Sequence, residues 1–556
     1  MTTRAIVLFT LVSLPDGLCQ SVNVPTNRYD NSRTGTNLSE TVLNTGNVRS
    51  HFGKLFEREV DGDLYAQPLI ATNVDIPGRG KRNVVYLATS NNSIYAYDAD
   101  DPAASSPYWH LSPATLGNPV PRNDVVDMGV LNLNFERTIG ITGTPVIDIS
   151  TQTIYVVVKS KDGGSRYAQR LHALDLSTGN ERKEFRSPIT IEASASGNGL
   201  GSKDGIIAFD PRKNLNRPAL LLLNGVVYVA FGSHDDDGEV HGYHGWIIAY
   251  DAKDLRQIAV YCTTPDGIQG GIWQSGAGLA TDSSSIYAVV GNGSLGGPDH
   301  GESVVKLESG PRLSVQQSFA PANSAYLNGR DLDLSSGPAF LPGTNLLLAC
   351  SKQGKCYLLD TNDMHLIQEF QSSINSVGTQ RAPNIHGTPV FWCSPCNSGQ
   401  NRIVRMYVWG EEDYLRAFRM DMEDFRLNGI GFVSDNQSTM HAPRLSMPGG
   451  ILTLSANGAQ TGTSVVWASH PMAGDANNST VPGILRAFDA ADISQELWNS
   501  EQEPARDRLG WFAKYCPPVV ANGKVYVATF AEPLAASVAS GASAKPNKLV
   551  VYGLLP

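Results

Sequence analysis

Short, strongly hydrophobic segments recur along the whole chain, and each has the composition of a buried β-strand. They are rich in β-branched and aromatic residues and are bounded by turn residues, as strands covered on both faces usually are. The segments follow the pattern Val-x-Tyr-Val-Ala and occupy residues 85–88, 154–157, 227–230, 286–289, 346–349, 406–409, 465–468 and 525–528. This recurrence indicates a repeat architecture, so a length of 556 residues does not require several domains.

Each recurring segment belongs to a unit of four strands. Most are preceded by a strand marked by Pro or Gly and followed by a strand that ends in a turn Asp, namely Asp98, Asp175, Asp251, Asp360 and Asp489. A fourth strand with an aromatic residue completes the unit, as at Trp498. This pattern predicts an all-β chain that forms a single eight-bladed β-propeller of four-stranded antiparallel blades. A tandem of β-sandwiches is the alternative, but sandwiches lack the recurring turn Asp.

The two ends of the chain predict how the propeller closes. The last unit has strands up to Val551 but no fourth strand, and Phe52–Glu57 has the pattern of the missing one. We therefore expect the last blade to be closed by an N-terminal strand, which removes exposed sheet edges. The propeller then spans residues 51–556, and residues 20–50 form an N-terminal extension.

Residues 1–19 have the pattern of a secretory signal peptide. Arg4 precedes an apolar run, Ala5–Leu14, that is too short to span a bilayer, and cleavage is expected near Cys19. A buried N-terminal strand is the alternative. Export would place the mature protein in a secreted or periplasmic location, and we expect no membrane span.

The cysteines that remain after such cleavage are even in number, which suits an oxidising compartment. Cys350 and Cys356 flank a tight turn and are expected to face each other across a hairpin. Cys393 and Cys396 have metal or redox spacing, but the sequence contains no second pair of that kind, and no His follows Cys396 as covalent haem attachment requires. We expect structural disulfides in both places and no haem.

The overall charge excludes one class of partner. The chain carries a net charge of −10 and lacks a cluster of Lys and Arg. Nucleic-acid binding depends on such clusters, so we expect no nucleic-acid partner.

Several long loops combine ionisable and aromatic residues, as functional loops on a rigid scaffold often do. The stretch from His234 to His244, with Glu239 inside it and Trp246 after it, is rich enough in His and Asp for a metal site, although a solvated acidic hairpin is the alternative. His386 and His441 are expected to begin inner strands, where they would line the central funnel; buried structural histidines are the alternative.

The turn Ala173–Gly179 and the strand around Trp498 resemble the tryptophan-docking repeats of the pyrroloquinoline-quinone (PQQ) propellers, and the resemblance extends from about residue 52 to 555. This superfamily contains quinoprotein alcohol dehydrogenases as well as non-catalytic scaffolds. In the dehydrogenases, a Trp lies beneath the flat quinone and an Asn ligates Ca²⁺. Trp273 and Asn292 match that motif, which suits aromatic stacking and a hard oxygen ligand.

The resemblance also assigns roles in the next two loops. Arg330–Asp333 is similar to the family segment that supplies the catalytic base, which implies Asp331 as that base and Asp333 as a metal partner. Ser351–Gly354 is similar to the turn whose Lys contacts the quinone oxygens, which implies that role for Lys352. Such a carboxylate accepts the alcohol proton while hydride passes to the quinone, and the cation stabilises developing charge.

Some family features differ in this chain. The alcohol dehydrogenases carry a disulfide between adjacent cysteines, and this sequence has no such pair. Alignment places Val240 where the family has a Glu ligand to Ca²⁺, so Glu239 is displaced by one position or the calcium site is incomplete. We expect no cytochrome domain fused to the propeller.

Two functions are therefore predicted as alternatives. The first is a quinoprotein-type dehydrogenase that oxidises small-molecule alcohols or sugars with PQQ and Ca²⁺. The second is a non-catalytic propeller that has lost the cofactor and binds a glycan, a protein or another ligand on its loop-rich face. The fold alone does not choose between them.

Overall fold

The computed structural model describes residues 21–125, 138–235, 242–376, 378–379, 381–394, 402–444, 446–477, 479–533 and 546–556. The predicted leader, residues 1–19, lies outside these ranges. Strands dominate the structure, which confirms the all-β prediction. The α-helices are short: α1 (Thr45–His51), α2 (Pro113–Leu116), α4 (Ser324–Asn328), α5 (Met422–Asn428) and α6 (Pro504–Asp507). Among the described residues, none of the helices has the length and apolarity needed to cross a membrane.

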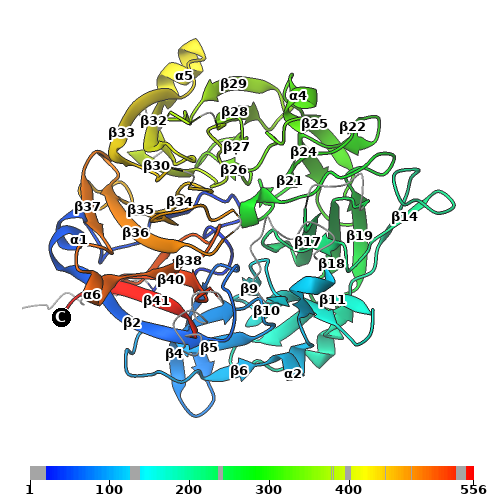
Figure 1. The fold of residues 1–556 in the computed structure, drawn as a ribbon, viewed down its shortest axis with the longest axis horizontal. Helices are drawn as coiled ribbons and strands as arrows, with labels where there is room; N and C mark the ends of the chain where they lie inside the picture. The colour runs from blue at the N-terminus through cyan, green and yellow to red at the C-terminus, as the bar shows by residue number, and fades with distance from the viewer. Residues whose placement is uncertain are drawn as a thin grey trace, which may run out of the picture.

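Most strands form four-stranded antiparallel sheets, which Figure 1 shows arranged like spokes around a central axis. The first contains β3 (Leu69–Ile76), β4 (Gly80–Ala88), β5 (Ile94–Asp98) and β6 (Trp109–Leu111). The second contains β9 (Val146–Asp148), β10 (Thr153–Lys161), β11 (Tyr167–Asp175) and β12 (Ile189–Thr190). The third contains β16 (Leu221–Leu223), β17 (Val226–Ser233), β18 (Trp246–Asp251) and β19 (Gln257–Cys262), with β15 (Asn214–Leu215) also paired to β17.

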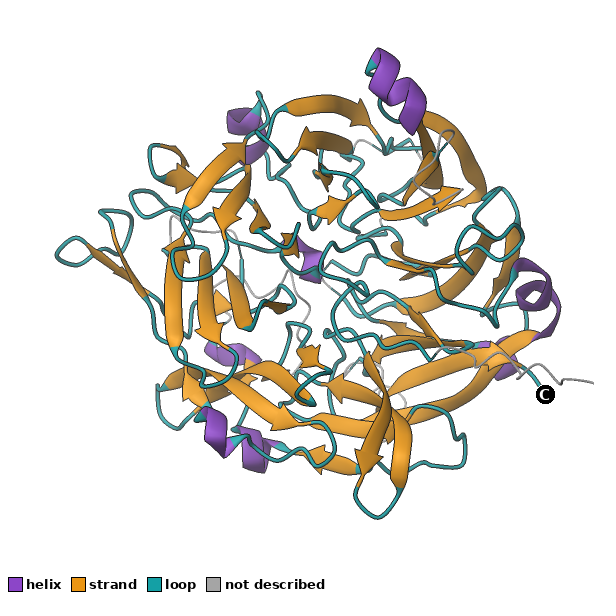
Figure 2. Ribbon diagram, turned by 180° about the vertical axis from the view of Figure 1, so that it is seen from behind, coloured by secondary structure: helices purple, strands orange, loops and turns teal. Residues whose placement is uncertain are grey.

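The pattern continues around the axis. The next sheets contain β20 (Ala280–Thr281), β21 (Ser285–Val290), β24 (Ser303–Glu308) and β25 (Val315–Phe319); then β26 (Ala339–Phe340), β27 (Leu346–Cys350), β28 (Lys355–Asp360) and β29 (Leu366–Gln371); then β30 (Val390–Ser394), β31 (Ile403–Val408), β32 (Tyr414–Asp421) and β33 (Val433–His441). Two-stranded ribbons pair β7 (Val120–Pro121) with β8 (Thr138–Ile139), β13 (Ser194–Ser196) with β14 (Ile206–Ala208), and β22 (Leu295–Gly296) with β23 (Asp299–His300). Figure 2 shows most helical turns at the rim.

The two ends of the chain meet in one larger sheet. It contains β34 (Ile451–Ser455), β35 (Val465–Pro471), β36 (Pro482–Asp489) and β37 (Glu496–Asn499), and also β39 (Val519–Ala521), β40 (Lys524–Phe530), β41 (Asn547–Leu554) and β2 (Phe52–Val60). The short strand β38 (Gly510–Phe512) joins the two sets because it pairs with both β36 and β40. The N-terminal strand β2 pairs antiparallel with β41, as the sequence predicted.

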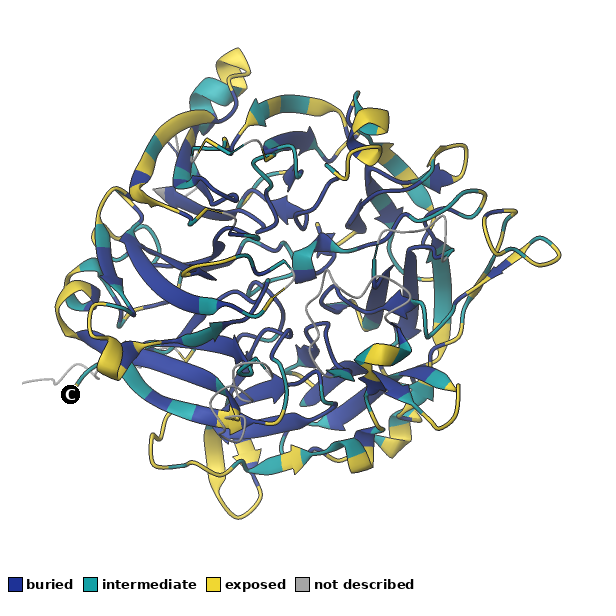
Figure 3. Cartoon of the chain, in the orientation of Figure 1, coloured by how far each residue is buried: buried dark blue, intermediate teal, exposed yellow. Residues whose placement is uncertain are grey.

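The recurring hydrophobic segments form the second strand of each four-strand set, namely β4, β10, β17, β21, β27, β31, β35 and β40. Each is buried on both faces between neighbouring sheets, and Figure 3 shows exposed residues mainly at the rim. Burial of one large aliphatic or aromatic side chain contributes about 1.5–3 kcal/mol. The repeated burial therefore explains why β-branched and aromatic residues recur at these positions.

The recurring turn Asp has a structural reason. Asp175 Oδ1 accepts hydrogen bonds from the backbone amides of Ser177 and Thr178, and it caps the turn after β11. In the sheet before it, the ring of Trp109 lies against Gly179, where a Cβ would stand 2.7 Å from the indole, and the indole Nε1 donates to Leu176 O at 2.9 Å. Gly179 has φ +73°, so glycine meets both the conformational and the spatial requirement. One sheet is thereby attached to the turn of the next.

The N-terminal extension crosses the first strands of all these sheets. Val24 bridges to Ile70 in β3, and β1 (Thr36–Asn37) pairs in parallel with β34. Between these points, hydrogen bonds or bridging contacts join residues 25–37 to Ile147, Leu220, Leu222, Thr281, Phe340, Phe391 and Val520. The extension therefore packs across one end of the central axis and is not a free tail.

Candidate functional site

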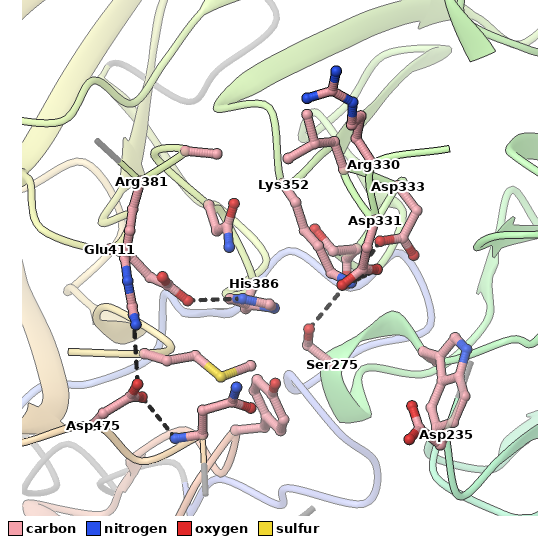
Figure 4. A pocket seen from close by; sticks show the side chains of 18 of the residues that line it. Asp235, Ser275, Arg330, Asp331, Asp333, Lys352, Arg381, His386, Glu411 and Asp475 are labelled. Atoms are coloured by element: carbon pink, nitrogen blue, oxygen red, sulfur yellow. Dashed lines mark hydrogen bonds and ion pairs between the residues drawn. The ribbon is translucent and has the colours of Figure 1, made fainter. Parts of the chain in front are cut away.

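One cavity of about 430 Å³ gathers residues that the sequence predicted separately. Its wall includes His234, Trp273, Asp331, Asp333, Lys352 and His386. These residues come from loops after or between strands of different sheets, and Figure 4 shows several of them around the opening. The cavity volume lies within the range of small-molecule sites.

Trp273 is held beside the cavity by glycines. A Cβ on Gly232 would stand 3.0 Å from Trp273 Cδ2, and one on Gly271 would stand 2.5 Å from its Nε1. Tyr243 packs edge-on, with ring centroids 6.4 Å apart and an interplanar angle of 81°. The indole is partly buried and lies just before the turn Gln274–Gly276. Small residues around it therefore fix the ring while leaving one side of it in the cavity wall.

Lys352 connects two aspartates from one loop. Its Nζ lies 2.5 Å from Asp331 Oδ1 and 2.7 Å from Asp333 Oδ1. Asn292 Nδ2 also donates to Asp331 Oδ1, at 2.9 Å. The side chain of Asp331 is 65% exposed, whereas that of Asp333 is 3% exposed. The four residues thus form one polar cluster in which Asp331 is the carboxylate that a ligand can reach.

Local backbone structure positions this cluster. Helix α4 ends just before it, and Leu332 N donates to Leu327 O at 3.0 Å, which folds the loop back on the helix. Asp331 has φ +51°, a left-handed conformation that is uncommon for a residue with a side chain. Lys352 N donates to Asp333 O at 2.9 Å. The loop that carries the aspartates is therefore hydrogen-bonded directly to the turn that carries the lysine.

A disulfide brackets the Lys352 turn. Cys350 and Cys356 are bonded, as the sequence predicted, and they are paired residues of β27 and β28. Cys393 is also disulfide-bonded, whereas Cys396 lies outside the described residues. Cys262 and Cys516 are free and buried.

His386 and Glu411 form a buried pair on another side of the cavity. His386 Nε2 lies 2.9 Å from Glu411 Oε1, and the two side chains are 4% and 5% exposed. The Tyr515 ring lies 5.7 Å from the imidazole, centroid to centroid. Figure 4 shows this pair apart from the Asp331 and Lys352 group. The carboxylate therefore fixes the orientation of the imidazole in this part of the cavity wall.

His234 contacts a buried lysine. Its Nε2 lies 2.8 Å from Lys159 Nζ, which also donates to the carbonyls of Arg212 and Asn214, each at 2.8 Å. Burial, followed by the positive charge of Lys159, holds the pKa of His234 well below its usual value. Burial also lowers the pKa of Lys159 to about 7. His234 is therefore a neutral imidazole at pH 7.

Three predicted pocket residues are not in the cavity wall. His244 is buried against Thr264 and Leu200, at 3.0 and 2.9 Å, and Trp246 is a fully buried first residue of β18. His441 does not begin an inner strand: it is the exposed last residue of β33, so that prediction was wrong. Glu239 lies outside the described residues.

Several residues of the cavity wall were missed in the sequence, and Arg217 and Tyr515 are two of them. Arg217 and Tyr515 both line it, but each lies next to a strand in a segment without a recognisable motif. Their loops are about three hundred positions apart, so no local pattern could have brought them together.

The metal prediction has limited support in the described part of the chain. Those residues contain no group of three or more His, Cys, Asp or Glu side chains placed to hold a metal ion. The carboxylate oxygens of Asp331 and Asp333 instead contact the Lys352 ammonium. A cation is thus present among these oxygens, but it belongs to the protein.

Comparisons with known proteins identify the fold. No protein-family model and no curated protein matches the chain. Among solved structures, quinohemoprotein alcohol dehydrogenase ADHIIG from Pseudomonas putida HK5 is 15% identical with a TM-score of 0.57, covering 96% of this chain and 80% of that one. Quinohemoprotein alcohol dehydrogenase from Comamonas testosteroni is 15% identical with a TM-score of 0.56. The match covers 96% of this chain and 82% of that one.

A third solved structure agrees with these two. A europium-containing methanol dehydrogenase is 13% identical with a TM-score of 0.55, and the match covers 96% of this chain and 98% of that one. At such identities the likeness concerns the fold over nearly the full length. The chain therefore has the same fold as these quinohemoprotein alcohol dehydrogenases and the methanol dehydrogenase, a β-propeller.

Proposed function

We propose that this protein is a quinoprotein-type dehydrogenase that oxidises small alcohols or sugars with PQQ, on an eight-bladed propeller of this fold. The observation that carries the proposal is the presence of Trp273, Asp331 and Lys352 in the wall of one cavity. These are the three positions to which the sequence resemblance gave stacking, base and quinone-contact roles. The dehydrogenase fold of the solved relatives supports the proposal, although their low identity supports no more than the fold.

The residues present fit PQQ. The cavity of about 430 Å³ is large enough for a flat cofactor of this size class, and Trp273 supplies an aromatic wall. Lys352 supplies a fixed ammonium only 15% exposed, which suits contact with an anionic or carbonyl oxygen. When bound, PQQ supplies the acceptor for the hydride that leaves the alcohol carbon.

Asp331 is placed to accept the alcohol proton. Lys352 and Asn292 both contact its Oδ1, so the carboxylate is oriented, and the exposure of its side chain leaves it open to substrate. The lysine contact also fixes the carboxylate that would act as the general base. Proton acceptance by a positioned carboxylate contributes about 10²- to 10⁴-fold to a rate.

The described residues do not complete a calcium site. Ca²⁺ requires six to eight oxygen ligands, whereas the oxygens of Asp331 and Asp333 converge on the Lys352 ammonium. Glu239, the further ligand considered from the sequence, lies outside the described residues. Calcium therefore enters only as a variable of the experiment, and no step of the mechanism depends on it.

The test combines binding and turnover. PQQ is titrated into the mature protein with and without Ca²⁺, and alcohol- and sugar-dependent dye reduction is then measured. We expect Asp331→Asn to retain PQQ binding and lose dye reduction by at least about 10²-fold, and Trp273→Ala to weaken PQQ binding. Asp363→Asn, an exposed aspartate elsewhere, serves as the matched control. Failure of the wild-type protein to bind PQQ would reject the proposal.

One observation favours a second candidate, a non-catalytic propeller that binds a glycan or protein. The Lys352 ammonium already forms an ion pair with both aspartates, so these carboxylates have a cationic partner without a metal ion. A glycan array and an affinity purification of partners test this candidate. Binding of a glycan or protein at the cavity, blocked by substitution of Trp273 and without turnover of any alcohol, would favour it over the dehydrogenase.

We also propose that the protein is exported and lies in a secreted or periplasmic location. The Cys350–Cys356 disulfide supports this, because disulfides persist mainly in oxidising compartments. N-terminal sequencing of the mature protein tests the proposal. Removal of residues up to about Cys19 is the expected result, and recovery of Met1 in the native host would contradict it.

A further inference from the structure

Arg217 is a fully buried arginine in the cavity wall. Arg217 is 2% exposed and lies between β15 and β16. Its Nη1 donates to Thr142 O at 3.3 Å, a long hydrogen bond. A Cβ on Gly276, in the turn that follows Trp273, would stand 2.5 Å from Nη1. Arg217 is therefore fixed beside the turn that carries the cavity tryptophan.

The rest of the Arg217 guanidinium lacks protein acceptors. Among the described residues, neither Nε nor Nη2 has a hydrogen-bond partner, and both atoms are buried. The groups that affect its charge electrostatically are Tyr515, Tyr65 and Cys516, none of which is a carboxylate. Other arginines of the chain differ: Arg416 and Arg506 each form a close ion pair with an aspartate. A buried guanidinium with unsatisfied N–H groups is energetically costly, and most buried polar groups in native proteins have hydrogen-bond partners.

Two aromatic rings and a second cationic side chain lie around Arg217. The guanidinium carbon lies 5.5 Å from the Tyr65 ring centroid and 5.4 Å from that of Tyr515, and such rings leave the N–H groups at the edge of the guanidinium without acceptors. A second buried cation, Lys514, lies nearby and donates to Asn477 O at 3.1 Å. Burial, and then the positive charge of Arg217, lowers the pKa of Lys514 to about 7. Two cations thus lie within electrostatic range of each other at one side of the cavity.

The geometry of the guanidinium indicates the class of ligand. Nε and Nη2 form one edge of the group, and two parallel N–H donors on that edge match the two oxygens of a carboxylate. We propose that this side of the cavity is an anion site, in which Arg217 binds the carboxylate of a small organic acid through Nε and Nη2. The site goes beyond the dehydrogenase proposal, because it requires neither PQQ nor Asp331.

The first experiment measures binding of small carboxylates to the full mature protein without PQQ, in chloride-free buffer. Acetate, benzoate and succinate are titrated by calorimetry, with acetamide and benzamide as neutral controls. We expect at least one acid to bind about tenfold or more tightly than its amide, and Arg217→Gln to abolish the difference. Arg312→Met, at an exposed arginine, is the matched control and should leave binding unchanged.

A stability measurement distinguishes loss of acid binding from failure of the variant to fold. Without anions, we expect the melting temperature of Arg217→Met to equal or exceed that of the wild type, because the variant removes a buried charge. Added carboxylate should raise the melting temperature of the wild type but not that of the variant. If no acid binds better than its amide, or if Arg217→Gln binds the acids as well as the wild type, the inference is overturned.

The carboxylate that binds Arg217 can belong to a cofactor or to a substrate. Further titrations distinguish these two sources. PQQ and its methyl esters are titrated into the wild type and Arg217→Gln. Equal loss of PQQ affinity on esterification and on substitution would assign the site to the cofactor. Unchanged PQQ affinity, with acid binding still lost in the variant, would assign it to a substrate. Acid binding without any PQQ binding would reject the dehydrogenase proposal and leave the anion site standing.

Discussion

The ammonium of Lys352 lies 2.5 Å from Asp331 Oδ1, and this contact determines the charge of the candidate site. The same nitrogen also reaches Asp333, which is nearly buried, so one lysine forms an ion pair with both carboxylates. A divalent cation that used these oxygens would have to displace an ammonium that is already in place. The Lys352 ammonium therefore competes with metal ions for these carboxylate oxygens.

The first prediction concerns Lys352→Met. Without the ammonium, the two aspartates become available to a metal ion, so we expect Ca²⁺ to bind measurably more tightly than to the wild type by calorimetry. In the absence of Ca²⁺, the free energy of unfolding should fall by about 1–3 kcal/mol, because the Asp333 carboxylate is left buried. Lys355→Met, which removes a partly exposed ion-pair partner of Glu369 just after the same turn, is the control. Equal Ca²⁺ affinity in all three proteins would contradict the prediction.

The second prediction concerns the Cys350–Cys356 disulfide, which spans a sequence separation of six residues around Lys352. Closing so short a loop restricts the unfolded chain modestly, so replacing both cysteines with Ser should lower the free energy of unfolding by about 2 kcal/mol in chemical denaturation. Because the turn also positions Lys352, PQQ binding should weaken at the same time. An unchanged PQQ affinity would show that the turn keeps its shape without the bridge.

The third prediction is a pH dependence due to Lys159, whose pKa burial lowers from 10.5 to about 7. Between these values the unfolded chain binds a proton that the folded chain has lost, so the free energy of unfolding rises with pH, by up to about 1.4 kcal/mol per pH unit. Below about pH 7 the lysine is protonated in both states, and this slope ends. Lys159→Met should remove the contribution, whereas Lys203→Met, at an exposed lysine, should keep it. If the free energy of unfolding depended on pH in the same way in all three proteins, this contribution of Lys159 would be refuted.

The fourth prediction concerns Arg33 in the N-terminal extension. This fully buried side chain donates to Leu279 O at 2.8 Å, Asn27 O at 2.8 Å and Leu220 O at 3.3 Å, and so joins the extension to two sheets. Arg33→Ala leaves these carbonyls without donors and opens a cavity. We expect a loss of about 2–4 kcal/mol in the free energy of unfolding, measured by denaturant titration. Arg79→Met, at an exposed hairpin, should change it little.

The sequence predicted the repeated strands because burial selects the same residue types each time. Val85, Val227 and Val525 each occupy a second strand with both faces covered, so their pattern is independent of distant contacts. The turns at the recurring aspartates could also be predicted, because the hydrogen bond from Ser177 N to Asp175 Oδ1 is local. Strand pairing between β2 and β41 could be predicted because each end had an incomplete unit.

The cavity could be predicted only in part. Trp273, Asp331 and Lys352 were found through short motifs, since each lies in a loop with its own local signature. Arg217 was missed because its role depends on Tyr515 and on the turn after Trp273, which lie far from it in the chain. Trp246 was misjudged because a tryptophan next to a His-rich loop has no sequence feature that distinguishes a core position from a pocket position.

The N-terminal extension has a consequence for how the chain reaches its native form. Tyr29 and Val520 are hydrogen-bonded to each other although 491 positions separate them, and Asn37 also donates to Val520 O. The sheets can form one after another as the polypeptide is made, but residues 22–37 have no complete set of partners until the last sheet exists. The N-terminal extension is made first, but it can dock fully only after the strands of the last sheet have formed. A fusion or truncation at either terminus acts on the same final step.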